Sequence, residues 1–328
     1  MIFVKRLLWI LSVLLVLSSL FCGCAIAENA AEAYVDAVSV DAAEELGYEA
    51  EMLEGEHAAA LPQLMNPTHP GTLVAENKKA VIDYSNTQDG YVMVCYTADT
   101  SKRLKVQVKG PRTTYTYNIK KGEWAVLPLT DGNGKYQVKV FRNTSGNSYT
   151  SVLAAKHKVT LSDEFAPFLR PNQYVDYNAA SKMVSLAHEL TKDIAHPLGK
   201  VEAIYNYVVT NLSYDKKKAK TVKSGYLPVL DEVLEAKKGI CFDYAALMTG
   251  MLRSQGVPCK MVFGYAGKAY HAWISVWSED TGWVDGVIFF DGTNWQRLDP
   301  TFASSADQSE AIMKYIGNGK NYKEKYFY

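Results

Sequence analysis

The feature that most constrains the fold is a change in the spacing of apolar residues near Pro167 and Pro171. Between residues 80 and 161, short segments alternate apolar and polar positions, as in Leu104–Lys109, which is typical of half-buried strands. Farther along, apolar residues recur at intervals of three and four, as on a helix face: Val201, Ile204, Tyr205, Val208, Val209 and Leu212. The sequence therefore predicts an all-β module at 80–161 and a mixed α+β domain at 162–328. Because the two patterns are distinct, each part is expected to bury its own core, and a chain beginning near Pro171 is expected to fold alone.

Turn signals punctuate the β module at short, regular intervals, which is typical of a small β-sandwich. They are Asp99-Thr100-Ser101, Gly110-Pro111, Lys121-Gly122, Asp131-Gly132-Asn133-Gly134 and Ser145-Gly146-Asn147. The module resembles immunoglobulin-like or fibronectin-like domains.

The first 27 residues have the features of an export signal. Lys5 and Arg6 precede an apolar run from Leu7 to Phe21, and Ala25-Ile26-Ala27 supplies the small residues that a signal peptidase reads. The run is shorter than the roughly 20 residues needed to span a bilayer. We expect cleavage after Ala27 and a secreted or cell-envelope protein. The alternative is a lipid anchor on Cys24, which follows the small residue Gly23.

Residues 28–79 are predicted to be an acidic, disordered linker, because Glu28 to Asn77 contains eleven acidic residues and no Lys or Arg. The whole chain balances 35 basic against 35 acidic residues. Without a basic excess, no nucleic-acid partner is expected. After signal removal three cysteines remain, Cys95, Cys241 and Cys259, which argues against a disulfide scaffold. We expect a monomer with no metal or cofactor.

Cys241 is the candidate nucleophile. It follows Gly239-Ile240 and precedes apolar residues at helical spacing, which predicts a helix whose first turn contains the thiol. Unpaired N–H groups and the positive end of the helix dipole stabilise a thiolate there, and the same groups can hold an oxyanion. Asp243 in that turn suits the dipole and is interpreted as structural. The sequence assigns no second oxyanion donor.

His271 and Asp299 follow Cys241 at spacings of 30 and 28 residues. Cys259–Tyr265 and His271–Trp277 are predicted strands, and Asp299 ends a third strand that begins near Trp295. His271, Trp273, Ser275 and Trp277 share one face of their strand, and Ala272, Ile274 and Val276 share the core face. Adjacent strands would place the carboxylate beside the imidazole, where it orients the ring, while the imidazole pairs with the thiolate and protonates the leaving group.

From about Asn178 to Phe302 the chain resembles the transglutaminase-like superfamily, which is related to papain-type cysteine proteases. The resemblance rests on Gly239-Ile240-Cys241-Phe242-Asp243-Tyr244-Ala245, Gly256-Val257-Pro258 with Gly264-Tyr265, His271-Ala272-Trp273, Arg297-Leu298-Asp299-Pro300-Thr301 and Asn211-Leu212-Ser213-Tyr214-Asp215. It implies an α+β fold, the roles just given for Cys241, His271 and Asp299, and no cofactor. The connection from Ser278 to Asn294 is long for this family.

Together these features predict an exported cysteine enzyme that acts on amide bonds of proteins or peptides through a thioester, with hydrolysis preferred. The alternatives are transfer to an amine or deamidation at glutamine, and a non-catalytic protein that binds a polypeptide or glycan at the cell surface. Trp273, Trp283 and Tyr214 are candidate substrate-binding residues, although large aromatics on strands are as often core residues.

Overall fold

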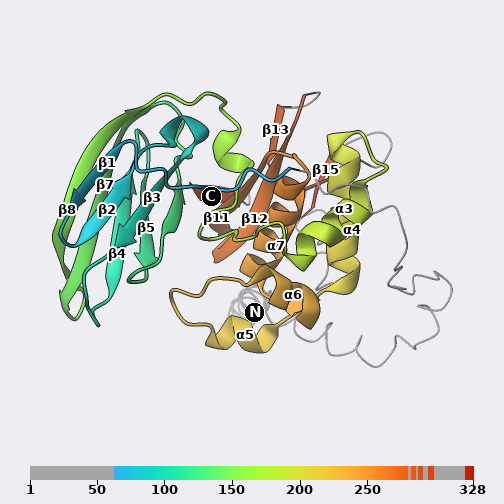
Figure 1. Ribbon diagram of the computed structural model, residues 1–328. Coiled ribbons are helices and arrows are strands. Elements are labelled where there is room, and N and C mark those ends of the chain that lie inside the picture. Colours follow the sequence, from blue (N-terminus) through green and yellow to red (C-terminus); the bar gives the residue numbers. More distant parts are fainter. Residues whose placement is uncertain (1–62, 280–281, 286, 291–294, 299–321) are drawn as a thin grey trace, which may run out of the picture.

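The computed structural model describes residues 63–279, 282–285, 287–290, 295–298 and 322–328. The predicted export signal, most of the acidic segment and Asp299 lie outside these residues. Figure 1 shows a β-sheet half and a mixed half, with residue 328 between them. Among the described residues, no helix is both long enough and apolar enough to cross a membrane.

The N-terminal half consists of two antiparallel four-stranded sheets that face each other (Figure 1). The first has the order β1-β2-β3-β6, with β1 (Val74–Asn77), β2 (Ala80–Asp83), β3 (Tyr91–Tyr96) and β6 (Ala125–Pro128). The second has the order β5-β4-β7-β8, with β5 (Thr114–Ile119), β4 (Leu104–Lys109), β7 (Gly134–Ser145) and β8 (Ser148–Val159). A 3-10 turn, η2 (Thr87–Asp89), precedes β3.

The predicted alternation is confirmed in this half. Leu104, Val106 and Val108 of β4 are buried, whereas Lys105, Gln107 and Lys109 face outward. The linker boundary at residue 79 is wrong, because Val74–Asn77 already form β1 and pair with β2. Four residues among polar neighbours give a weak periodic signal, but main-chain pairing does not require an apolar pattern.

The second half begins with η3 (Ala166–Phe168) and is α+β, as predicted. Its helices are α3 (Lys182–Thr191), α4 (Pro197–Asn211), α5 (Lys216–Thr221), α6 (Leu230–Ala236) and α7 (Cys241–Ser254). Its sheet has the order β13-β12-β11-β16, formed by β13 (Gly282–Asp285), β12 (Ala269–Ser278), β11 (Cys259–Ala266) and β16 (Tyr322–Phe327). Two further pairs are β9 (Ser213–Tyr214) with β10 (Lys238–Gly239), and β14 (Val287–Phe290) with β15 (Trp295–Leu298).

Helix α7 is the central element of this half. It contacts α3, α4 and α6 as well as β11 and β12, and Leu247, Met248 and Met251 are fully buried. Its small residues permit this close packing: a Cβ at Gly250 would lie 2.8 Å from Leu230 Cδ1. The helix that carries Cys241 is therefore fixed by packing on several sides.

The expectation of two separate cores is wrong. Tyr115 and Tyr117 of the sandwich pack edge-on against Tyr328, with ring centroids 5.5 and 5.9 Å apart. Thr130 Oγ1 also donates to the main-chain oxygen of Phe327 at 3.0 Å. Buried side chains form one continuous cluster across the boundary. A chain beginning near Pro171 would lack Tyr115 and Tyr117 and would leave the ring of Tyr328 in water, which the change of sequence pattern alone does not show.

Candidate active site

Cys241 is the first residue of α7, as predicted, and its side chain is partly exposed. Cys95 and Cys259 are buried, and all three thiols are free. Burial raises the pKa of the Cys95 thiol above its ordinary value. Burial also raises the pKa of the Cys259 thiol, to about 11. Cys241 differs from both in its position, because it is accessible to solvent and lies beside the main-chain N–H groups at the N-terminus of a helix.

Asp243 fixes the turn that carries the thiol. Its carboxylate is fully buried and accepts a hydrogen bond from the Ile240 N–H at 2.8 Å. It also accepts hydrogen bonds from Lys218 Nζ at 2.7 Å and from the Tyr226 hydroxyl at 2.6 Å. Burial, and then the hydrogen bond to Asp243, raises the pKa of Tyr226. The structural interpretation of Asp243 agrees with these contacts, whereas Lys218 and Tyr226 were missed.

Gly239 is required by the same network. A Cβ at this position would lie 2.6 Å from the Asp243 Cβ, which no real packing tolerates. The Gly239 carbonyl also accepts from the Asp215 N–H at 2.7 Å, within the short β9–β10 pair. The spacing Gly239, Cys241, Asp243 thus combines a close backbone approach, the thiol and a buried carboxylate in five successive residues.

The chain direction brings His271 to the Cys241 end of the unit. β11 follows α7 and runs back along it, and β12 then returns, so the beginning of β12 lies near the N-terminus of α7. Ring contacts confirm this placement: Phe242 lies 4.9 Å from Phe263, and Phe263 lies 5.9 Å from Tyr270. The residues next to Cys241 and His271 in sequence are therefore joined through Phe263.

Both faces of β12 are buried. Ala272, Ile274 and Val276 pack in the core with α7, as predicted. His271 lies on the other face and is 7% exposed, with its ring centroid 6.2 Å from that of Trp273. The structure thus places the imidazole at the Cys241 end of β12 but on the face of the strand opposite α7, beside a buried indole, so the pairing of His271 with Cys241 stays a prediction from the sequence.

Tyr270 is the ionisable residue on the α7 side of β12 and was missed by the sequence analysis. Its pKa is raised to about 12, mainly by burial, with smaller contributions from neighbours that include Cys241. Its side chain is nevertheless 54% exposed, and the adjacent Tyr265 is 38% exposed. The rim beside the thiol is therefore aromatic and open to water.

The third member of the predicted triad, Asp299, lies outside the described residues. The strand expected before it is present as β15, which begins at Trp295. Within the described part of the chain, β15 pairs with β14, and the partners of β12 are β11 and β13. The role of Asp299 stays a prediction from the sequence.

The candidate substrate-binding residues fall in three different surroundings. Tyr214 is partly buried and pairs with Gly239, two residues from the thiol. Trp273 is 2% exposed and packs edge-on against Tyr322. It is therefore a buried neighbour of the His271 ring and not a surface residue. Trp283 pairs with Trp277, at the other end of β12 from His271, and Lys260 Nζ lies 3.4 Å from its ring centroid. Trp283 therefore lies away from the Cys241 end of the sheet, and its role in substrate binding stays a prediction.

Comparison with known proteins identifies the domain. Residues 184–286 match the family described as the transglutaminase-like superfamily. An uncharacterised protein of Bacillus subtilis, YebA, is 23% identical over 180 residues, which cover 48% of this chain and 24% of that protein. An uncharacterised protein of Mycobacterium tuberculosis is 30% identical over 131 residues, 36% of each chain. A protein-glutamine gamma-glutamyltransferase of Pseudomonas aeruginosa is 27% identical over 143 residues, 38% of this chain and 19% of the relative.

Solved structures show more distant likenesses. A protein of Cytophaga hutchinsonii, described as a candidate cysteine protease, covers 73% of this chain and 76% of its own, at 17% identity and a TM-score of 0.37. The match to red sea bream transglutaminase covers 69% of this chain and 53% of that protein, at 12% identity and a TM-score of 0.31. Both scores are below 0.5, so neither likeness bears on activity.

The chain spans 24% of the Bacillus relative and 36% of the mycobacterial one, so it corresponds to a part of each. The family match covers α7 with Cys241 and β12 with His271, which are the elements of the candidate site. Residues 184–286 therefore form the core of a transglutaminase-like superfamily domain, α+β in fold and preceded by a β-sheet-rich region.

Proposed function

We propose that this protein is a cysteine enzyme that hydrolyses amide bonds of proteins or peptides through a thioester on Cys241. The observation that carries the proposal is the contrast among the three thiols. Cys241 is the one at a helix N-terminus and partly exposed, whereas Cys95 and Cys259 are buried with raised pKa values. A reactive cysteine requires access and stabilisation of its thiolate.

In the proposed reaction, the Cys241 thiolate attacks the carbonyl carbon of the amide, and the main-chain N–H groups of the first turn of α7 stabilise the oxyanion. The His271 imidazolium gives its proton to the leaving amine as the C–N bond breaks, which leaves a thioester. His271 then takes a proton from water as the water attacks the thioester, and the acid and the free thiolate are released.

Hydrolysis is our first choice because the rim beside the thiol is open. Tyr270 and Tyr265 expose 54% and 38% of their surface, so water has access to the acyl-enzyme. Transfer to an amine requires that water be kept out. The match to a protein-glutamine gamma-glutamyltransferase favours transfer or deamidation at glutamine as the second candidate.

We further propose that the protein acts outside the cytoplasm or in the cell envelope, because residues 1–27 have the features of an export signal. The mass of the mature protein tests this. A chain beginning at Glu28 supports signal peptidase cleavage, a diacylated Cys24 supports the anchored form, and an unprocessed chain contradicts both.

The activity is tested by mass spectrometry of a peptide library incubated with the protein in the presence and absence of a primary amine. Cleaved peptides support hydrolysis. A gain of about 1 Da at glutamine supports deamidation, and a gain of the amine mass less ammonia supports transfer. If the library is unchanged and iodoacetamide labels Cys241 no faster than an ordinary thiol at mildly acidic pH, the protein is a non-catalytic binding protein.

A further inference from the structure

The outer face of the β5-β4-β7-β8 sheet has an unusual charge. Every charged residue of these four strands is basic. The lysines that point outward, which we call the lysine track, are Lys105, Lys109, Lys135, Lys139, Lys156 and Lys158; Arg142 is the remaining cation. The whole chain has a net charge of zero, so this face is basic by arrangement and not by composition.

No lysine of the track forms an ion pair within the described part of the chain, although surface lysines elsewhere do. Lys120 pairs with Glu123 at 3.3 Å, Lys121 with Asp99 at 2.5 Å and Lys192 with Glu189 at 2.7 Å. Acidic residues farther away compensate little, because charges are screened beyond about 8 Å at physiological salt. The positive potential of the track is therefore not cancelled locally.

The strand register arranges these lysines in order. Lys135 lies opposite Lys158 in the first cross-strand row. Lys109 and Lys156 lie on either side of Gln137 in the next row. Lys139 follows, opposite Gln107. Lys105, opposite Phe141, completes the track.

Rows on one face of a sheet are two residues apart, which is about 6.6 Å along the strands. Each row of the track carries at least one cation, over a total of about 20 Å. Like charges placed directly opposite each other, such as Lys135 and Lys158, destabilise a sheet. A ligand that neutralises them would remove this repulsion.

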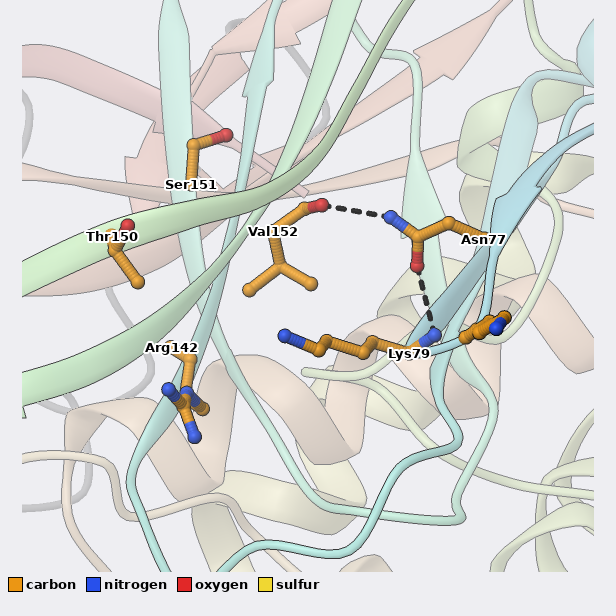
Figure 2. A pocket seen from close by; sticks show the side chains of 7 residues that line it. Asn77, Lys79, Arg142, Thr150, Ser151 and Val152 are labelled. Carbon is orange, nitrogen blue, oxygen red and sulfur yellow. Dashed lines mark hydrogen bonds between the residues drawn. The ribbon is translucent and has the colours of Figure 1, made fainter.

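The cross-strand row of Lys105 runs through Phe141 to Ser151 of β8, which lines a pocket between the two sheets. This pocket has a volume of about 370 Å³ and is lined by Asn77, Lys78, Lys79, Arg142, Thr150, Ser151 and Val152, with no acidic residue among them. Figure 2 shows the Lys79 side chain extending toward the space below Val152, on the side of Arg142. Asn77 Nδ2 donates to the Val152 carbonyl at 2.9 Å and so joins the turn that carries Lys78 and Lys79 to β8.

We propose that the lysine track and the adjoining pocket bind a linear polyanion, a chain with repeating phosphate, sulfate or carboxylate groups. An extended chain running along the strands would meet a cation in each row, and a terminal anionic group could enter the pocket. Lysine ammonium groups act as point charges that suit such a ligand without selecting its sequence. Among the described residues, the exposed large hydrophobic side chains lie outside these four strands, so the face offers none for insertion into a bilayer.

The test measures binding of two fluorescent probes, inorganic polyphosphate and a heparin oligosaccharide, to the whole protein at several salt concentrations. In the variant K109Q/K135Q/K139Q/K156Q we expect affinity to fall at least tenfold at low salt. The slope of log K against log salt should become smaller by roughly three, at about 0.7 per lost contact. The charge-preserving variant with Arg at the same four positions should keep the affinity.

The matched control is K216Q/K217Q/K220Q/K223Q, which removes the same charge from exposed lysines of α5 and the loop after it. This control should bind like the unaltered protein. If only one probe binds in a track-dependent way, the proposal holds and the probe identifies the anionic group. The proposal is overturned if neither probe binds, if the control loses as much affinity as the track variant, or if the protein binds vesicles containing phosphatidylserine but neither soluble polymer.

Discussion

Two cysteines near α7 lie in opposite surroundings, Cys241 at its N-terminus and Cys259 at the start of β11, the strand that follows it. At the N-terminal end, Cys241 is partly exposed beside an open aromatic rim. Beyond the C-terminal end, Cys259 is fully buried and its thiol contacts Thr249 Oγ1 at 3.6 Å. The comparison teaches that residue type does not determine reactivity: one end of the helix offers access and dipole stabilisation, whereas burial at the other end favours the neutral thiol.

The largest expected effect comes from removing the exposed thiol. Cys241→Ala should abolish turnover of any peptide found in the library, because no nucleophile remains, while the urea unfolding curve changes little. Cys259→Ala, made in parallel, should keep turnover within a few-fold of the unaltered protein. Measurable turnover by Cys241→Ala would show that the reactive group lies elsewhere.

His271→Ala should lower turnover by several orders of magnitude, because nothing remains to protonate the leaving amine. The pH profile of Cys241 alkylation should also move upward, since the thiolate loses its cationic partner. Stopped-flow turnover and iodoacetamide labelling from pH 5 to 9 measure the two effects. If both are unchanged, His271 is not paired with Cys241 and the non-catalytic interpretation becomes preferable.

Asp299→Asn should slow turnover less than His271→Ala does, but still by several orders of magnitude. The Cys241 thiol should remain open to alkylation. The amide cannot support the charge of the imidazolium or fix its orientation. Asp285→Asn, a change of the same kind on β13, is the control and should leave turnover nearly unaltered. Equal effects of the two changes would remove Asp299 from the site.

Arg253 stabilises the C-terminal end of α7. Its buried guanidinium donates to the carbonyl of Cys259 at 2.8 and 2.9 Å, to that of Arg170 at 2.8 Å and to the main-chain oxygen of Tyr328 at 2.6 Å. Arg253→Met should lower the free energy of unfolding by about 3 kcal/mol, because buried acceptors lose their donors. Exposed Arg112→Met should cost less than about 1 kcal/mol. A similar loss in both variants, measured by urea unfolding, would contradict this role of Arg253.

The smallest expected effect is a dependence on alkaline pH. The folded-state pKa of Cys259 is raised from 9.0 to about 11 by burial. Its stabilising contribution is therefore fully present below pH 9 and is lost as the pH rises through 11, because the unfolded chain loses its proton first. The free energy of unfolding is measured at pH 8 and at pH 10.5. Its decrease over this range should be about 1 to 2 kcal/mol smaller for Cys259→Ala than for the unaltered protein. Equal losses would show that Cys259 titrates normally.

Much of this architecture could be predicted because it depends on local pattern. The start of α7 at Cys241, the strand that carries His271 and the alternation of β4 are each encoded within a few residues. What the sequence analysis missed depends on side chains that are distant in sequence. Lys218 and Tyr226 reach Asp243 from 25 and 17 residues away, and no periodicity records such a contact.

Trp283 illustrates the same limit in another way. Its residue type and its place after the histidine suggested a substrate groove, but strand register puts it beside Trp277 and Phe168, far along β12 from the imidazole. Register is set by the pairing of whole strands. The shared interface of the two halves was missed for a related reason. Tyr115 and Tyr328 are in contact in the structure but are separated by most of the sequence.

The position of β16 has a consequence for the order of events during synthesis. This strand is made after all other described strands, yet it pairs with β11 in the sheet that carries His271, and Tyr328 fills the boundary with the sandwich. Until it emerges from the ribosome, β11 has an unpaired edge and the aromatic rings of the sandwich have no cover. Completion of this sheet thus waits for β16, and the site gains its full support only after that strand has emerged.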